Sequence, residues 1–323
     1  ELREMMQRAV GLHRDGRIDQ AMAAYNSVLV REPRHADALQ FLGVAKMQTG
    51  RGDEAIELFE RSIAIHSKNS QAHYNLGLAL RSAGKETRAL VSLRRAIAVE
   101  PRNFEAHNAI AGILLAAPEE LKTAEVHIRR ALENNPKYVP ARNNLALLLK
   151  ARGRPEEAAS EARVAVTQAP GYTPALITLG ALLLEMGETE EAEKILREAA
   201  ALAPEDSTAH VNLGAALNYV GMRAEAEAEF ERALELDPEN TQSLNDLALI
   251  RSSQGRQDEA AALLQRALIL KPGDATVQAN LGAVFRRQEK WGDSITCFRG
   301  ALDIDPDNSG RAQNFVDSLS GGA

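Results

Sequence analysis

Eight prolines recur along this chain at an almost constant interval, and this rhythm constrains the fold more than any other feature. The first interval is 68 residues, the second 35, and all later ones 34; the prolines are Pro33, Pro101, Pro136, Pro170, Pro204, Pro238, Pro272 and Pro306. Ser67 stands at the middle of the long interval, where a proline is missing. A fixed period of this length indicates stacked structural repeats, each in contact only with its neighbours. We therefore expect one elongated array in place of the two globular domains that 323 residues would suggest.

Nine units of 34 residues plus one inserted residue account for nearly the whole chain. The predicted domain is a single solenoid over 2–308, with repeats at 2–35, 36–69, 70–103, 104–138, 139–172, 173–206, 207–240, 241–274 and 275–308. Residues 309–323 then form a predicted capping helix and tail. Ala312, Phe315, Val316 and Leu319 continue the apolar stripe there, and a solenoid needs such a helix to cover its last hydrophobic face.

Each repeat is predicted to hold two amphipathic helices. In residues 36–69, apolar side chains stand three and four residues apart on both sides of Gly50, which is the spacing of one helix face. Glycine favours the left-handed conformation that ends a helix, so we place the turn between the helices there. The same glycine recurs in most repeats, as Gly16, Gly50, Gly84, Gly153, Gly187, Gly221 and Gly255.

Small residues fill two further columns of the repeat. The first helices carry Ala9, Gly43, Gly77, Ala111, Ala146, Gly180, Gly214, Ala248 and Gly282, and the second helices carry Ala21, Ala55, Ala89, Ala124, Ala158, Ala192, Ala226, Ala260 and Ser294. Small side chains let two helices approach closely, so we expect these columns to mark the helix contacts. Two repeats depart from the pattern: Pro118, Glu119 and Glu120 replace the glycine turn in the fourth, and residues 288–291 replace it in the ninth.

These columns resemble those of the tetratricopeptide repeat, which has Leu-Gly or Leu-Ala in its first helix, Gly before its second, Ala within the second and Pro at the end. The resemblance covers residues 2–308 and implies an all-α, right-handed superhelical α-solenoid of tandem helix-turn-helix repeats with a C-terminal capping helix. The Asn-Leu-Gly sequences beginning at Asn75, Asn212 and Asn280 also resemble the superhelical arm of O-linked N-acetylglucosamine transferase and its bacterial relatives.

The sequence holds no recognisable constellation for catalysis or for a cofactor. Its histidines do not form a His-x-x-x-His pair, so we predict no metal site, and we found neither a phosphate-binding glycine loop nor a Gly-x-Ser-x-Gly elbow. His73, His107 and His210 share one repeat position, where we expect a packing role. Cys297, the only cysteine, stands at a core position beside Phe298 and is predicted to be a buried, inert thiol. We therefore predict that the chain is not an enzyme and carries no cofactor.

The net charge and the hydropathy of the sequence limit the partners that we expect. A net charge of −7 disfavours nucleic acid, because affinity for it comes mainly from neutralising phosphates. No run of eighteen apolar residues is present, so we predict no membrane insertion, and we place the chain in the cytoplasm. Residues 185–240 hold fifteen acidic and four basic residues, which we interpret as a solvated outer face.

The candidate binding site is the concave face that first helices line in stacked repeats. The position before Leu-Gly is expected to point into it, and from the first repeat to the ninth it holds Gln7, Phe41, Asn75, Ala109, Asn144, Thr178, Asn212, Asp246 and Asn280. An asparagine amide both donates and accepts hydrogen bonds, so it can hold a peptide unit without reading side chains. Neighbouring candidates are Arg81, Asn108, Asn143, Lys150, Asn218, Tyr219, Asn245 and Arg286.

The transferase arm holds an extended polypeptide by such a ladder of asparagines. The resemblance implies that role for Asn75, Asn144, Asn212 and Asn280, and less directly for Asp246 and Thr178, while Phe41 and Ala109 interrupt the ladder. The alternative is that these asparagines serve local hydrogen bonding only. The family's carboxylate clamp for chaperone tails is not expected, because no Lys or Arg occupies the ladder position.

Three functional hypotheses remain from the sequence. The first is a scaffold that binds a protein or an extended peptide in the concave groove. The second is the substrate-recognition arm of a larger enzyme, such as a bacterial glycosyltransferase; the ends of the chain, Glu1 and Ser-Gly-Gly-Ala, are typical of a fragment and keep this hypothesis open. The third is self-association, end to end or through convex faces.

Overall fold

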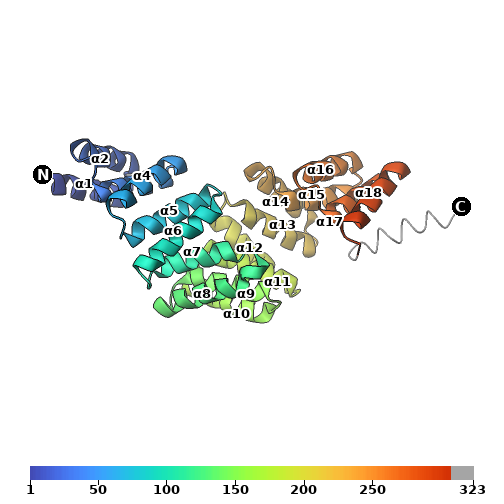
Figure 1. Ribbon diagram of the computed structural model, residues 1–323. Coiled ribbons are helices and arrows are strands. Elements are labelled where there is room, and N and C mark those ends of the chain that lie inside the picture. Colours follow the sequence, from blue (N-terminus) through green and yellow to red (C-terminus); the bar gives the residue numbers. More distant parts are fainter. Residues whose placement is uncertain (307–323) are drawn as a thin grey trace. The chain divides into compact units, whose positions relative to one another are not determined.

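The computed structural model describes residues 1–306, and every regular element in that range is helical (Figure 1). In chain order the elements are α1 (Leu2–Arg14), α2 (Ile18–Arg31), α3 (Ala36–Gln48), α4 (Gly52–Ile65), α5 (Ser70–Ser82), α6 (Glu86–Val99), α7 (Phe104–Leu114), the 3-10 helix η1 (Pro118–Glu120), α8 (Leu121–Asn134), α9 (Val139–Ala151), α10 (Pro155–Gln168), α11 (Thr173–Glu185), α12 (Thr189–Leu202), α13 (Ser207–Tyr219), α14 (Arg223–Leu236), α15 (Thr241–Ser253), α16 (Gln257–Leu270), α17 (Ala275–Arg287) and α18 (Trp291–Ile304). The predicted fold class, an all-α solenoid of tandem helix-turn-helix repeats, is confirmed. The predicted capping helix lies outside the described residues.

The chain divides into two compact units. Unit 1 is Glu1–Gln168 and holds α1 to α10; unit 2 begins at Ala169 and holds α11 to α18. In both, each odd-numbered helix packs on the even-numbered helix that follows, and that helix packs on the next odd-numbered one. Successive odd-numbered helices also contact one another, as α5 does α7 and α15 does α17. We call the surface of the odd-numbered helices in each unit its first-helix face.

Residues in the left-handed backbone conformation end most of the first helices. The seven glycines predicted at the turn all have positive φ, between 69° and 88°. The two repeats that were predicted to lack the glycine turn differ from each other. In the fourth repeat, α7 stops at Leu114 and η1 replaces the glycine turn. In the ninth, Glu289 adopts φ 60° in place of a glycine. The turn geometry is therefore retained there by a residue that is strained in this conformation.

The two small-residue columns explain how the helix pairs approach. A Cβ added to Gly180 of α11 would lie 2.4 Å from Leu196 Cγ of α12, and one added to Gly214 of α13 would lie 2.8 Å from Phe230 of α14. Leu196 and Phe230 are completely buried. Each glycine thus makes room for a large side chain of the following helix, and this burial of apolar area is the main stabilising term of the solenoid.

The shared histidine position has the structural role that the sequence indicates. His73, His107 and His210 each place Nε2 within 3.1 Å of the backbone carbonyl oxygen six residues earlier in the chain. The imidazole therefore donates to the turn that enters the first helix, since a carbonyl oxygen only accepts. Within residues 1–306, no helix combines the length and the apolar character needed to cross a membrane.

Candidate functional site

Asparagine amides bridge neighbouring helices on the first-helix face of unit 1. Asn144 Nδ2 of α9 donates to Asn108 Oδ1 of α7 at 2.8 Å and lies 3.4 Å from the Asn108 carbonyl oxygen. Arg81 of α5 reaches the same place from the other side: a Cβ on Gly112 of α7 would lie 3.4 Å from Arg81 Nη1 and 3.7 Å from Asn144 Nδ2. The structure thus brings three of the predicted site residues together over the backbone of α7.

The other candidates in unit 1 each have their own local surroundings. Asn75 accepts a hydrogen bond from Gln71 Nε2 at 3.1 Å on its own helix. Asn143 is 6 % exposed, and its Oδ1 has no hydrogen-bond partner among the described residues. Lys150 is half-buried near the end of α9. The cluster of Arg81, Asn108 and Asn144 is therefore the part of the predicted site with the clearest shared geometry.

Phe41 interrupts the predicted ladder because it belongs to an aromatic group. Its ring stacks on Tyr25 of α2, with centroids 6.0 Å apart and planes 12° from parallel. His13 meets Tyr25 edge-on and lies 3.2 Å from the Tyr25 hydroxyl through Nδ1. These residues line a depression that extends to Asn75 on α5. Burial raises the pKa of Tyr25 to about 12, so its hydroxyl stays protonated and neutral at physiological pH.

A second amide bridge, with a carboxylate beside it, lies on the first-helix face of unit 2. Asn280 Nδ2 of α17 donates to Asn245 Oδ1 of α15 at 2.7 Å, and Asn245 Nδ2 donates to Asp246 Oδ1 at 2.9 Å. Burial raises the pKa of Asp246, and hydrogen bonds from Asn245 and Gln242 oppose that rise in part. This cluster couples two helices through neutral amides and leaves a carboxylate against them.

The remaining candidates of unit 2 are not linked to one another by hydrogen bonds that the structure shows. Asn212 Nδ2 donates to the Thr208 carbonyl oxygen within α13 at 2.8 Å. Asn218 is exposed, and Tyr219 is 71 % exposed at the end of that helix. Thr178 of α11 is buried. The interrupted ladder therefore stays a prediction, while two separate bridges are observed.

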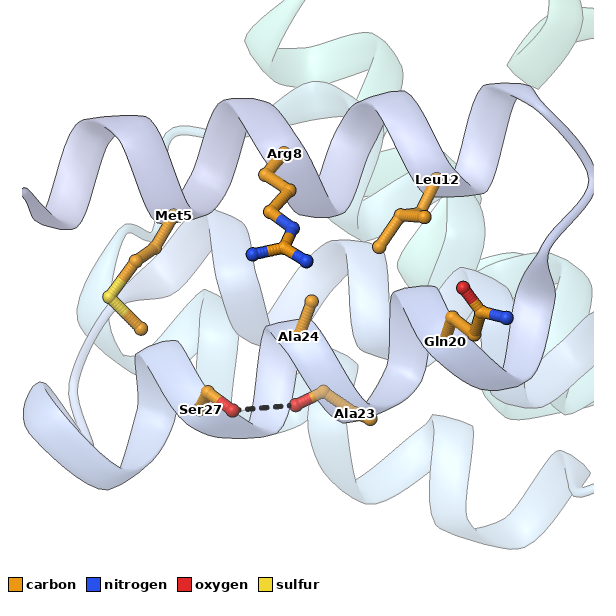
Figure 2. A pocket seen from close by; sticks show the side chains of 7 residues that line it. All are labelled: Met5, Arg8, Leu12, Gln20, Ala23, Ala24 and Ser27. Atoms are coloured by element: carbon orange, nitrogen blue, oxygen red, sulfur yellow. Dashed lines mark hydrogen bonds between the residues drawn. The ribbon is translucent and has the colours of Figure 1, made fainter.

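A further depression lies between the first two helices. Figure 2 shows Met5, Arg8 and Leu12 of α1 facing Gln20, Ala24 and Ser27 of α2. The Ser27 hydroxyl donates to the Ala23 carbonyl oxygen of the same helix at 2.9 Å. The Arg8 guanidinium is the one charged group in this lining.

Cys297, His107 and His127 have chemically reactive side chains, and each is packed within the fold. Cys297 is buried as predicted, and burial raises the pKa of its thiol, which keeps it out of the reactive thiolate form. His107 Nδ1 and His127 Nδ1 lie 2.9 Å apart between α7 and α8, and burial lowers both pKa values. In the part of the chain that the structure describes, no three His, Cys, Asp or Glu residues are grouped to hold a metal ion.

One residue of the unit 1 cluster was not among the sequence candidates. Gly112 stands inside α7, where glycine lowers helix stability by roughly 0.5–1 kcal/mol relative to alanine. Other repeats of unit 1 have Val44, Leu78 and Leu147 at this position. Unit 2 has Ala181, Ala215, Leu249 and Ala283 there, so the only signal in the sequence is that Gly112 is the single glycine of a mixed column.

Comparisons with known proteins agree on the repeat. Family models described as tetratricopeptide repeat match residues 12–80 and 151–217, 219–275 and 254–309, 127–159, and 70–103. The comparison with curated proteins gave no match.

Among solved structures, the human IFIT1 dimer with PPP-AAAA is 18% identical, with a TM-score of 0.68 over 96% of this chain and 79% of that chain. The human IFIT1 dimer with m7Gppp-AAAA is 17% identical, with a TM-score of 0.67 over 94% and 77%. A monomeric IFIT1 mutant with Gppp-AAAA is 18% identical, with a TM-score of 0.70 over 99% and 82%. This likeness concerns the fold alone. With the repeat pattern, the helix pairs and the matching models all in agreement, the chain belongs to the tetratricopeptide-repeat family.

Proposed function

We propose that the chain is a non-catalytic scaffold that binds an extended protein segment on its first-helix faces. The observation that carries the proposal is the pair of amide bridges, Asn108 with Asn144 and Asn245 with Asn280. A primary amide has two N–H donors and an oxygen acceptor, so a bridge that uses one donor and one oxygen leaves the other groups for a ligand. All four side chains are partly exposed.

The spacing of the repeats suits such a ligand. Packed helices lie about 8–10 Å apart, and an extended chain advances about 3.3 Å per residue, so one repeat matches about three peptide residues. A side-chain amide at each step can hydrogen-bond the backbone of the ligand. Backbone capture of this kind holds a strand without requiring a particular sequence.

The bridges also make the amides suitable anchors. Each bridge fixes the orientation of two side chains before any ligand arrives, and preorganisation lowers the entropy cost of binding. The predicted recognition-arm and self-association roles stay predictions. The IFIT1 structures contain RNA-type ligands, but the net charge of −7 on this chain opposes the attraction of phosphates. We therefore favour polypeptide.

The test compares an amide-deleted variant with a control whose asparagine substitutions lie outside the first-helix faces. Asn144, Asn212 and Asn280 are changed together to Ala, and Asn26 and Asn134, which are exposed on second helices, are changed to Ala in the control. Binding of a fluorescent heptapeptide pool with degenerate positions is followed by fluorescence polarisation, and helicity by circular dichroism. We expect about hundredfold weaker binding for the triple variant, from the loss of three hydrogen bonds worth about 1 kcal/mol each, and unchanged binding for the control.

Equal binding by the triple variant and the wild type would remove the amides from the mechanism. A second arm presents PPP-AAAA RNA to the wild type. Binding of that RNA without binding of the peptide pool would overturn the polypeptide proposal.

A further inference from the structure

Gly112 leaves a gap between the side chains of the first-helix face of unit 1, and polar groups from α5 and α9 fill it. The gap arises because α7 has no side chain at the position where α5 has Leu78 and α9 has Leu147. Arg81 Nη1 and Asn144 Nδ2 lie 3.4 Å and 3.7 Å from where a Cβ would stand. A ligand side chain that comes to this place meets both groups.

The groups around the gap are rich in hydrogen-bond donors. The Arg81 guanidinium has five N–H donors, and it forms no hydrogen bond or ion pair with any residue in the range 1–306. Asn144 Nδ2 donates to Asn108 Oδ1 at 2.8 Å and, at the longer distance of 3.4 Å, to the Asn108 carbonyl oxygen. The nearby acceptor, Asn108 Oδ1, is already engaged in that bridge. Donors therefore outnumber free acceptors at this place.

The positive charge of Arg81 also has no ion-pair partner among residues 1–306. Arg81 is exposed at the end of α5. Burial raises the pKa of Tyr74, Glu105 adds to that rise, and the charge of Arg81 opposes it. Glu105 forms no ion pair with Arg81. The gap thus presents one cation with two flanking amides. Such a set matches a planar anion with two acceptor oxygens, because guanidinium binds a carboxylate through two parallel hydrogen bonds.

We propose that Arg81, Asn144 and Asn108 form a subsite for the side-chain carboxylate of an Asp or Glu in the bound segment. This inference rests on the proposed function and adds a charge preference to backbone capture. The carboxylate accepts from Arg81, and the Asn144 amide exchanges its long hydrogen bond to the Asn108 carbonyl oxygen for one to the ligand. Gly112 lets the two donor groups lie side by side. A phosphate group fits less well, since a single arginine leaves half of a dianion unneutralised.

The subsite is tested with four heptapeptide pools that differ only in a fixed central residue: Glu, Gln, Lys or phosphoserine. All other positions are degenerate, and binding to the full chain is measured by fluorescence polarisation. A charge-assisted hydrogen bond contributes about 1.5–3 kcal/mol, and exposure of Arg81 reduces this, so we expect the Glu pool to bind about fivefold to tenfold tighter than the Gln pool.

Two variants and one control assign the preference to the gap. Arg81→Gln is expected to equalise the Glu and Gln pools. Gly112→Leu is expected to do the same by filling the gap with the side chain found at Leu78 and Leu147, and it improves helix propensity, so folding is retained. Arg102→Gln, at an exposed arginine in the turn before α7, keeps the preference.

The outcomes separate this inference from the proposed function. Equal binding of the Glu and Gln pools by the wild type overturns the subsite and leaves the groove in place. Tighter binding of the phosphoserine pool than of the Glu pool overturns the assignment to a carboxylate. Binding of none of the pools overturns the proposed function and the subsite with it.

Discussion

At the scale of single residues, the contact between a first-helix glycine and a large second-helix side chain sets how closely the pair packs. Gly180→Ala would place a methyl group 2.4 Å from Leu196 Cγ, and Leu196 is completely buried and cannot move aside. Overpacking of this kind costs about 1–3 kcal/mol, partly offset by about 1 kcal/mol from the better helix propensity of alanine. We expect urea unfolding monitored by circular dichroism to show a lower midpoint for unit 2. Gly171→Ala, which meets no atom within 4 Å, should leave that midpoint unchanged.

Another residue-scale prediction concerns the ninth turn. Glu289 has φ 60°, a conformation that costs a residue with a Cβ about 1–2 kcal/mol. We expect Glu289→Gly to remove this strain and to raise the thermal unfolding midpoint of unit 2 by a few degrees. Gly255→Ala is the opposite change at the corresponding turn, where φ is 84°, and it should lower the midpoint. A lower midpoint for Glu289→Gly would mean that the side chain stabilises the turn by more than its strain.

These residues also show what the sequence could and could not reveal. The glycine turns were predictable because a positive φ favours glycine. The small-residue columns were predictable because close helix contact requires a small side chain. The bridge from Asn144 to Asn108 was not, because it depends on the separation of α7 and α9, which the repeat period does not specify. The stacking of Phe41 on Tyr25 depends in the same way on side-chain geometry between helices. The ladder positions were therefore predicted individually, and their pairing was not.

At the scale of helices, the two imidazoles between α7 and α8 form a pH-sensitive contact. His107 Nε2 donates to the Pro101 carbonyl oxygen, so neutral His107 accepts at Nδ1, and His127 Nδ1 donates to it. Burial lowers the pKa of His127 to about 4, and the positive charge of Arg94 adds to the effect. Burial also lowers the pKa of His107, with Arg130 acting in the same direction and Glu133 in the opposite one.

We expect this contact to make unit 1 less stable in mild acid. Between pH 6.5 and about 4 the unfolded chain binds a proton at His127 that the folded chain does not, so the free energy of unfolding falls as the pH falls through that range. His127→Gln keeps an N–H donor for His107 but does not titrate. Its unfolding midpoint in urea, measured from pH 7 to pH 5, should decline less than that of the wild type. Parallel declines would show that the contact does not respond to protons.

At the scale of the whole molecule, the period and the division into units lead to different expectations about cooperativity. The prolines keep their interval of 34 through Pro136, Pro170 and Pro204, so the sequence shows no sign of a boundary near Gln168. The boundary arises from packing between helices, which the spacing of turn residues does not report. In a solenoid, stability is a sum of repeat terms and nearest-neighbour contacts, so a local weakness is felt mainly by adjacent repeats.

The single tryptophan makes this testable in the intact chain. Trp291 begins α18 of unit 2, so its fluorescence reports unfolding there, whereas circular dichroism reports the helices of both units. Gly43→Ala would place a methyl group 2.6 Å from buried Phe59 in unit 1, and Gly214→Ala would place one 2.8 Å from buried Phe230 in unit 2. We expect Gly43→Ala to shift part of the circular dichroism transition to lower urea without moving the fluorescence transition. Gly214→Ala should shift the fluorescence transition as well. If both substitutions move both signals equally, the nine repeats unfold as one cooperative solenoid, because destabilising either unit would then destabilise the whole chain.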